Sequence, residues 1–182
     1  MKKYIQALHA AIDGISDLSK ASDLLRGAIR AELPIYVCGN GGSASMADHF
    51  VIDMMKMAGA HNITSLSSNN AVITAWGNDV SYNDIFGAQL LRLKHKSILV
   101  AISSSGRSEN VLRAARIVRT NNGEVIGISR KGGVRDGETY NPLLTIATYP
   151  ISIPSDDTQI LEDVTGTVLH MLARIVRDGN YD

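Results

Sequence analysis

The chain has 182 residues, 45% of them hydrophobic, which is enough for one domain with a substantial core and too few for two large ones. Its 18 Lys and Arg residues balance its 18 Asp and Glu residues, so net charge gives no reason to expect direct binding to nucleic acid or to a membrane surface. The single cysteine, Cys38, excludes an intrachain disulfide framework, and its apolar surroundings predict a buried core thiol rather than a nucleophile. No stretch approaches the roughly 18 apolar residues of a membrane span or begins like a secretory signal. We therefore expect a cytoplasmic protein with a single domain over residues 1–182.

The first 30 residues carry a helical pattern. Their apolar positions recur every three or four residues and form one narrow stripe, made of Ile5, Leu8, Ile12 and Ile15. The pattern predicts a long N-terminal helix with a break near residues 19–23. A narrow stripe is typical of a seam between helices, so it fits either packing on the protein's own core or contact with a neighbouring subunit. We favour the second alternative and predict that residues 1–30 serve oligomerisation.

From residue 34 onward, short apolar runs alternate with helical stretches. The runs do not alternate strictly between polar and apolar residues, which is typical of parallel strands buried on both faces. The predicted strands span residues 35–38, 63–67, 97–102, 124–129 and about 143–148. The predicted helices span residues 43–58, about 70–76, 83–94, 107–121 and about 156–177. The expected fold is therefore α/β, with a doubly wound parallel sheet in a three-layer αβα sandwich over residues 34–178 and an exposed glycine-rich loop at residues 132–137.

Two of the predicted strands end in turns of small and hydroxyl-bearing residues that lead directly into helices. The first turn covers residues 39–44 (Gly-Asn-Gly-Gly-Ser-Ala), and the second covers residues 103–108 (Ser-Ser-Ser-Gly-Arg-Ser). A helix N-terminus exposes unpaired N–H groups and carries about half a positive charge, and parallel sheets bind ligands beyond the carboxyl ends of their strands. We therefore expect a phosphate at these turns, although ordinary tight turns with helix-capping serines would have the same composition.

The first turn is similar to a dinucleotide-binding fingerprint, but the second strand ends without the acidic residue that would hold a ribose. It is not a nucleotide P-loop, because no Gly-Lys-Ser or Gly-Lys-Thr follows the glycines. The remaining interpretation is a monophosphate held by backbone N–H groups and by the hydroxyls of Ser103, Ser105 and Ser108.

Two pairs of ionisable residues lie on helices that flank this pattern. His49 and Asp53 are four residues apart on one helix face and could form a two-ligand arm for a divalent metal, although such pairs are also common as structural contacts. Glu162 and His170 are eight residues apart, about 12 Å along a helix and about 80° around it, so both can face one cavity. Gly166 lies between them at a cost of about 1 kcal/mol relative to alanine, which suggests that another group approaches the helix closely there.

The two turns occur together with residues 76–79 (Trp-Gly-Asn-Asp), 83–86 (Asn-Asp-Ile-Phe), 161–163 (Leu-Glu-Asp) and 168–170 (Val-Leu-His). In this combination the chain resembles the sugar isomerase (SIS) domain, and within it the phosphoheptose isomerase family, also called sedoheptulose-7-phosphate isomerases. The resemblance covers about residues 3–177. It implies interconversion of the ketose D-sedoheptulose 7-phosphate and the aldose D-glycero-D-manno-heptose 7-phosphate through an enediol. It also implies a homotetramer whose active sites lie between subunits, with a zinc ion in each site.

The resemblance further implies roles for individual residues. The substrate-binding positions would be Asn40, Gly41, Gly42, Ser43, Asp53, Asn78, Asp79, Ser103, Ser104, Ser105, Ser108 and Glu162. The metal positions would be His49, Asp53, Glu162 and His170. Isomerisation needs one group that removes a proton from the carbon beside the carbonyl and a second that moves protons among the oxygens. We assign these catalytic roles to Asp53 and His170, in either order.

Two positions depart from the family pattern. Asp53 stands where the family has glutamate, and Glu162 stands where it has glutamine. Both positions are acidic here and both histidines are present, which favours chemistry over a purely binding role. The alternatives are a non-catalytic SIS protein that binds a phosphosugar or the replication initiator as a regulator, and an isomerase for a different phosphosugar.

Overall fold

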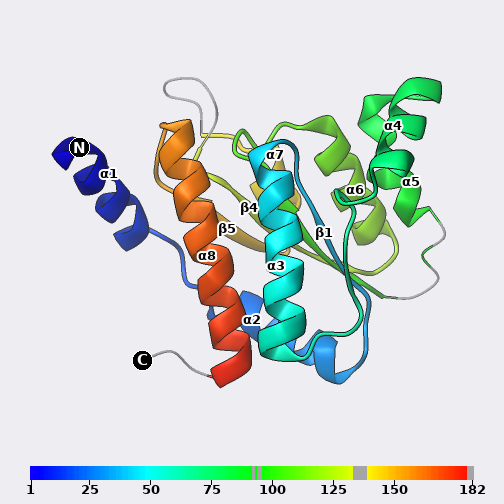
Figure 1. Cartoon of the computed structure of the whole chain (residues 1–182), viewed down its shortest axis with the longest axis horizontal. Helices are drawn as coiled ribbons and strands as arrows, with labels where there is room; N and C mark the ends of the chain where they lie inside the picture. Colours follow the sequence, from blue (N-terminus) through cyan, green and yellow to red (C-terminus); the bar gives the residue numbers. More distant parts are fainter. Residues whose placement is uncertain (92, 94–95, 133–138, 180–182) are drawn as a thin grey trace.

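A parallel sheet of five strands forms the centre of the structure, a computed structural model that describes residues 1–91, 93, 96–132 and 139–179 (Figure 1). The strands are β1 (Ile35–Cys38), β2 (Ile63–Ser65), β3 (Ile98–Ile102), β4 (Glu124–Arg130) and β5 (Tyr149–Ile153). They are ordered β2-β1-β3-β4-β5, and each neighbouring pair is parallel. Strand order reverses between β1 and β3, and ligands of open α/β sheets bind at such a switch point.

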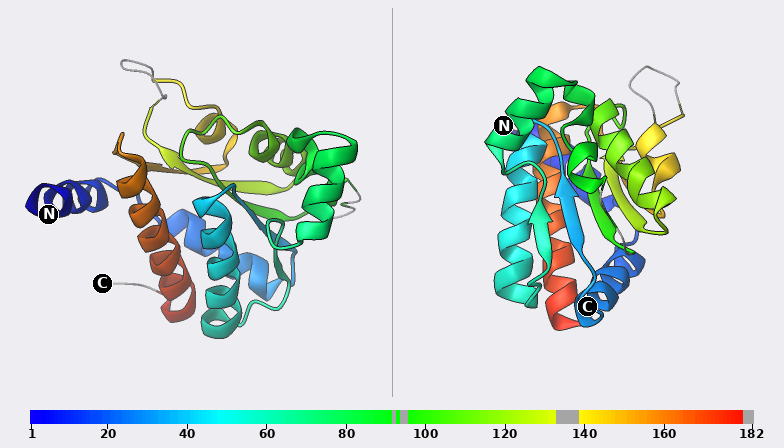
Figure 2. Two further views of the ribbon diagram at one scale, coloured as in Figure 1. Left: turned by 45° about the horizontal axis from the view of Figure 1, so that its top comes forward. Right: turned by 90° about the vertical axis from the view of Figure 1, so that its right-hand side faces the viewer.

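Helices cover both faces of the sheet, and each face has its own apolar core (Figure 2). One face is covered by α2 (Ser19–Arg30), α3 (Gly42–Ala58) and α8 (Thr158–Asp178), and α1 (Lys2–Asp13) packs beside α8. The other is covered by α4 (Asn70–Asp79), α5 (Gly87–Leu90), α6 (Glu109–Thr120) and α7 (Pro142–Ile146), with the 3₁₀ helix η1 (Tyr82–Asp84) between α4 and α5. This arrangement confirms the predicted doubly wound α/β fold with three layers.

The central strand β3 shows why the apolar runs lack a polar alternation. Ile98, Val100 and Ile102 enter the core on the α3 and α8 face, whereas Leu99 and Ala101 enter the core on the α6 face. Successive side chains of a strand point to opposite faces, and here both faces are covered. All five residues are therefore buried and apolar.

The predicted strand over residues 143–148 is wrong, because these residues begin in a helix and the last strand starts only at Tyr149. Pro142 occupies the first turn of α7, where its fixed backbone angle suits a helix, and the side chain of Asn141 caps that turn by accepting from the backbone N–H of Leu144. Leu143 is completely buried against the α6 face of the sheet. An apolar run therefore fills the core here as a short helix.

The predicted continuous helix over residues 83–94 is also wrong within the part that the structure describes, where η1 and α5 are short and separate. Residues 92 and 94 of that prediction lie outside the described residues. The segment follows its contacts with α6 rather than its own helical pattern: Asp84 pairs with Arg113 at 2.6 Å, and a Cβ at Gly87 would lie 3.1 Å from Ile117.

The N-terminal segment forms two helices rather than one long helix, and the break lies at residues 14–18, earlier than predicted. Ser19 starts α2, with the carboxylate of Asp17 accepting from its N–H and its hydroxyl. Helix α1 extends away from the body beside α8 (Figure 2), where the hydroxyl of Tyr4 donates to Asp163 at 2.6 Å.

Apart from Gly132, the glycine-rich loop predicted at residues 132–137 lies outside the described residues. Among the helices that the structure describes, none has the combination of length and apolar character needed to cross a membrane.

Candidate active site

The two predicted turns meet at the carboxyl edge of the sheet, since they follow the adjacent strands β1 and β3. They border a cavity of about 320 Å³. Seven of the predicted substrate-binding residues line this cavity, namely Asn40, Ser43, Ser103, Ser104, Ser105, Ser108 and Glu162. Ile102, Arg130, Thr158 and Leu161 complete its described lining. The structure thus collects hydroxyl groups and helix N-termini around one space, as phosphate binding requires.

The second turn, residues 103–108, is held in shape by its own hydroxyls and by one glycine. Gly106 has a φ of +67°, which side chains with a Cβ rarely adopt, and its N–H donates to the backbone oxygen of Ser103 at 3.0 Å. The hydroxyl of Ser103 lies 3.1 Å from that of Ser108, the residue that precedes α6. Ser108 makes no side-chain capping bond to α6, so the contact with Ser103 is the hydrogen bond that its hydroxyl makes in the described structure.

The first turn lies against α8 through Glu162. A Cβ at Gly42 would lie 2.8 Å from Glu162 Oε1, so this carboxylate approaches the N-terminus of α3 closely. A negative charge at a helix N-terminus is favourable, because it faces the positive end of the helix dipole. Glu162 is therefore a wall of the serine-lined cavity.

Asn40 is fixed by contacts that the sequence did not indicate. Its side-chain amide forms a reciprocal pair with that of buried Asn110, at 3.0 and 2.9 Å, and the hydroxyl of Tyr82 donates to its Oδ1 at 3.1 Å. Asn110 lies two residues after Ser108, in the first turn of α6. This proximity to the serine turn is the one feature of the sequence that could have indicated a role for Asn110. The pair links the first turn to the start of α6, next to the second turn.

Asn78 and Asp79 lie elsewhere. They are exposed at the end of α4, where the Asn78 amide donates to Asp79 Oδ1 at 2.7 Å, and neither is in the described lining of the cavity. Gly41 and Gly42 flank the cavity without lining it.

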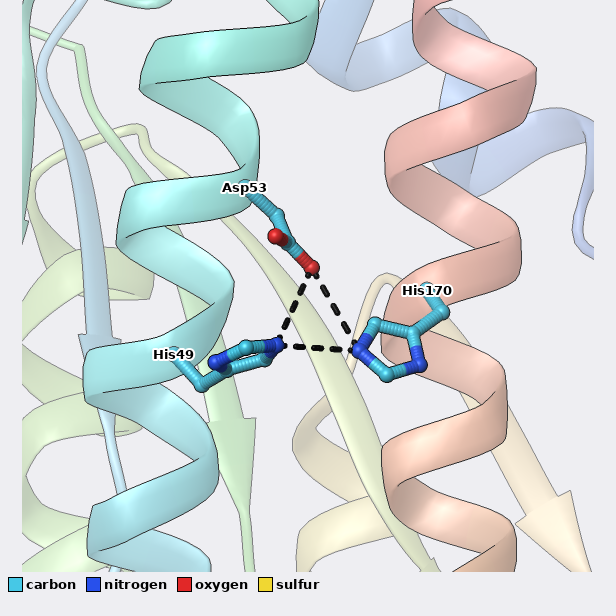
Figure 3. Close-up of side chains that lie close together, drawn as sticks. All are labelled: His49, Asp53 and His170. Atoms are coloured by element: carbon cyan, nitrogen blue, oxygen red, sulfur yellow. Dashed lines mark hydrogen bonds and ion pairs between the residues drawn. The ribbon is translucent and has the colours of Figure 1, made fainter.

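Figure 3 shows a second constellation, in which His49 and Asp53 of α3 face His170 of α8. The two histidine Nε2 atoms are 3.0 Å apart, and each is 3.5 Å from Asp53 Oδ2. The rings meet edge to face, with centroids 5.2 Å apart. The histidine side chains are 60% and 56% exposed, whereas that of Asp53 is 17% exposed. The cluster therefore lies at the surface, over the packed helices.

The cluster has the donor set and spacing of a zinc site. A tetrahedral zinc ion with bonds of about 2.0–2.1 Å holds its ligand atoms about 3.3 Å apart, close to the edges of this triangle. Two imidazoles and one carboxylate would leave the fourth position open, as in catalytic zinc sites. Glu162 is not among the described residues whose ligand atoms converge here, since it lies eight residues from His170, about 12 Å along the helix axis. The predicted set of four metal positions is thus divided between the cluster and the cavity wall.

Gly166 lies midway between Glu162 and His170, at i, i+4 spacing from each, so the three form one column along α8. No atom of the described chain lies within 4 Å of the place where its Cβ would be, so the expected close approach is not made within this chain. At the two ends of this column Glu162 approaches Gly42 and His170 contacts His49, so Gly166 lies between the cavity wall and the cluster.

Cys38 is completely buried in β1, and burial raises its pKa to about 12, because the thiolate loses the stabilisation that water gives. We expect iodoacetamide at pH 8 to leave the folded protein unlabelled and to label it fully in urea, as measured by intact mass. Labelling of the folded protein at the rate of free cysteine would contradict a buried thiol.

Comparison with known proteins places these features in one family. Residues 2–130 match the model of the SIS domain. The chain is 32% identical over 179 residues to the phosphoheptose isomerase of Halorhodospira halophila, covering 94% of this chain and 88% of that one. It is 35% identical over 164 residues to that of Bordetella avium, covering 85% and 79%. The solved phosphoheptose isomerase of Neisseria gonorrhoeae superposes with a TM-score of 0.81 at 25% identity, covering 96% and 93%. The chain therefore belongs to the SIS-domain family of phosphoheptose isomerases.

Proposed function

We propose that this protein is an aldose–ketose isomerase that interconverts D-sedoheptulose 7-phosphate and D-glycero-D-manno-heptose 7-phosphate. The observation that carries the proposal is that a serine-lined cavity and a histidine–carboxylate cluster lie along the same pair of helices, α3 and α8. The relatives named phosphoheptose isomerase support the same activity. The complete cluster favours an enzyme over a regulator that only binds its ligand.

The cavity would hold the phosphate end of the sugar. Hydroxyls of Ser103, Ser105 and Ser108 and the N-termini of α3 and α6 would donate hydrogen bonds to the phosphate oxygens. The sugar chain would pass Gly166 and place its carbonyl end near His170 and Asp53. Binding energy at the unreactive phosphate would thereby position the reacting carbons.

His170 and Asp53 would move the protons. One of them removes a proton from C1 of the ketose while the C2 carbonyl oxygen gains a proton, which gives the enediol. Return of a proton to C2 and loss of the proton on the C1 oxygen then give the aldose, so no atoms are lost or gained. An imidazole and a carboxylate are suited to both steps, because their pKa values can be tuned towards neutrality.

We also propose one zinc ion per site. His49, Asp53 and His170 would hold it, while Glu162 would contact the substrate instead. A bound zinc ion supplies a Lewis acid that polarises carbonyl and hydroxyl oxygens.

Self-association as a homotetramer would complete the site. The cluster is half exposed in the single chain, and Ile52 and Met55 on the same helix are 49% and 41% exposed. Tyr4 and Ile5 on the protruding helix α1 are exposed as well. Leu8, Ile12 and Ile15 of the predicted stripe pack against the chain's own core, so the proposed subunit contact of residues 1–30 rests on the exposed Tyr4 and Ile5. Exposed Ile52 and Met55 support a neighbouring subunit that covers the cluster.

The test is to incubate purified protein with D-sedoheptulose 7-phosphate, with and without added zinc, and to follow aldose formation by NMR. We expect turnover that rises with zinc. A lack of turnover with seven-, six- and five-carbon ketose phosphates, together with tight binding of the replication initiator, would contradict the isomerase proposal and favour the regulatory function.

A larger side chain at Gly166 is expected to block the path of the sugar. Gly166→Leu should lower kcat/KM about 100-fold, since displacement of a substrate by about 1 Å has effects of that size. The matched control, Gly166→Ala, should retain most activity and stabilise α8 by about 0.5–1 kcal/mol, because alanine is the better helix former. NMR rates and thermal unfolding measure both effects. Full activity in Gly166→Leu would exclude this path.

A further inference from the structure

Arg130 lines the serine-lined cavity, although no motif in the sequence includes it. It is the last residue of β4, and its side chain is only 11% exposed. Its backbone N–H donates to the backbone oxygen of Ser104 at 3.4 Å, and the hydroxyl of the preceding Ser129 donates to the same oxygen. Arg130 is thus attached to the turn that would hold the phosphate.

On one edge of the Arg130 guanidinium, one of the two nitrogens has hydrogen-bond partners and the other has none in the described part of the chain. Nη2 donates to Asp156 Oδ1 at 2.5 Å and to the backbone oxygen of Ser155 at 3.5 Å. Nε, on the same edge, is buried and has no hydrogen-bond partner in the part of the chain that the structure describes. This edge of a guanidinium matches two oxygens of a carboxylate or phosphate at once, so a suitable ligand would satisfy both nitrogens.

The present partner of Arg130 is easily replaced. The Asp156 side chain is 88% exposed, and ion pairs with an exposed partner contribute little, because water screens them. Among the described residues that line the cavity, Arg130 carries the one positive charge and Glu162 the one negative charge. A phosphate dianion at the serine turn would therefore find its charge partner in Arg130.

We propose that Arg130 is a binding and specificity residue, which exchanges Asp156 for the phosphate of the bound sugar and selects phosphorylated over unphosphorylated sugars. This inference rests on the proposed binding of a phosphosugar. The serines would orient the phosphate by hydrogen bonds, and the guanidinium would neutralise its charge. When no ligand is bound, the guanidinium would stay paired with the carboxylate of Asp156, as in this structure.

The test compares wild type, Arg130→Gln, Arg130→Lys and Asp156→Asn by calorimetric titration with D-sedoheptulose 7-phosphate, unphosphorylated sedoheptulose and inorganic phosphate. We expect Arg130→Gln to weaken binding of the phosphosugar about 10- to 100-fold, the usual effect of losing a charged hydrogen bond, without changing binding of the free sugar. The phosphosugar affinity of Arg130→Lys should lie between those of wild type and Arg130→Gln. The lysine ammonium keeps the positive charge but cannot donate two parallel hydrogen bonds as a guanidinium does. In turnover assays Arg130→Gln should raise KM more than it lowers kcat.

Asp156→Asn keeps Arg130 and tests the exchange separately. It should bind inorganic phosphate about two- to fivefold more tightly than wild type, since the competing carboxylate is gone. Unchanged phosphosugar affinity in Arg130→Gln, or weaker phosphate binding in Asp156→Asn, would overturn the role of Arg130 while leaving the proposed isomerase intact. Absence of phosphosugar binding by the wild type would overturn both.

Discussion

His170→Ala is expected to lower kcat/KM for D-sedoheptulose 7-phosphate about 1,000-fold, as loss of a general acid or base does. The substitution removes the imidazole whose Nε2 lies 3.0 Å from His49 and 3.5 Å from Asp53. Nε2 would bind zinc, and the other ring nitrogen, Nδ1, would then be the one left to carry a proton. NMR rates measure the loss of activity, and elemental analysis of the purified protein should show less bound zinc.

The matched control for this variant is His61→Ala. His61 is also exposed, but it lies beyond the C-terminus of α3, at the opposite edge of the sheet. We expect full activity and unchanged zinc content. Because His170 is 56% exposed in the single chain, His170→Ala should keep the fold, as measured by its circular dichroism spectrum. Wild-type rates in His170→Ala would exclude this cluster as the catalytic site.

Gly106→Ala is expected to reduce the free energy of unfolding by about 2–4 kcal/mol and to weaken phosphosugar binding with it. The φ of +67° is strained for alanine, and the added Cβ would lie 2.0 Å from Asn141 Oδ1. Asn141 is buried, and its amide donates to the Ser129 hydroxyl and to the backbone oxygen of Arg130. The new methyl group therefore disturbs both the serine turn and the end of β4. Urea unfolding and calorimetric titration measure the two effects.

Gly27→Ala provides the comparison for this glycine. Gly27 lies on α2 with no atom within 4 Å of a new Cβ, so the substitution should stabilise the protein by about 0.5–1 kcal/mol and leave binding unchanged. Equal free energies of unfolding for Gly106→Ala and wild type would show that the serine turn does not need a glycine at its position with positive φ.

Most of the fold could be predicted because its signals are local. The apolar runs that became β1, β3 and β4, and the helical patterns of α3, α6 and α8, depend on periodicities within single elements. The predictions were wrong in segments whose secondary structure depends on contacts with other parts of the chain. Residues 143–146 are apolar enough for a strand, but the cap at Asn141 and the core contacts of Leu143 make them helical. Contacts with α6 likewise divide the segment after α4 into η1 and α5.

The candidate site divides in the same way. The pairing of His49 with Asp53 follows from spacing on one helix, whereas their contact with His170 joins residues 121 positions apart. The sequence did not indicate Asn110 and Arg130, because both matter through contacts between distant positions. Asn110 pairs with Asn40, 70 positions away, and Arg130 on β4 bonds to Ser104 in the turn after β3.

By itself the sequence determined the parallel α/β class, the two glycine- and serine-rich turns and the family, because these depend on local composition, periodicity and motif spacing. Only the tertiary structure decided that Glu162 belongs to the cavity wall while His170 joins His49 and Asp53, and that Arg130 stands beside the serine turn. These outcomes depend on how α3 packs on α8 and on which strands are neighbours. Distances along the chain do not specify either arrangement.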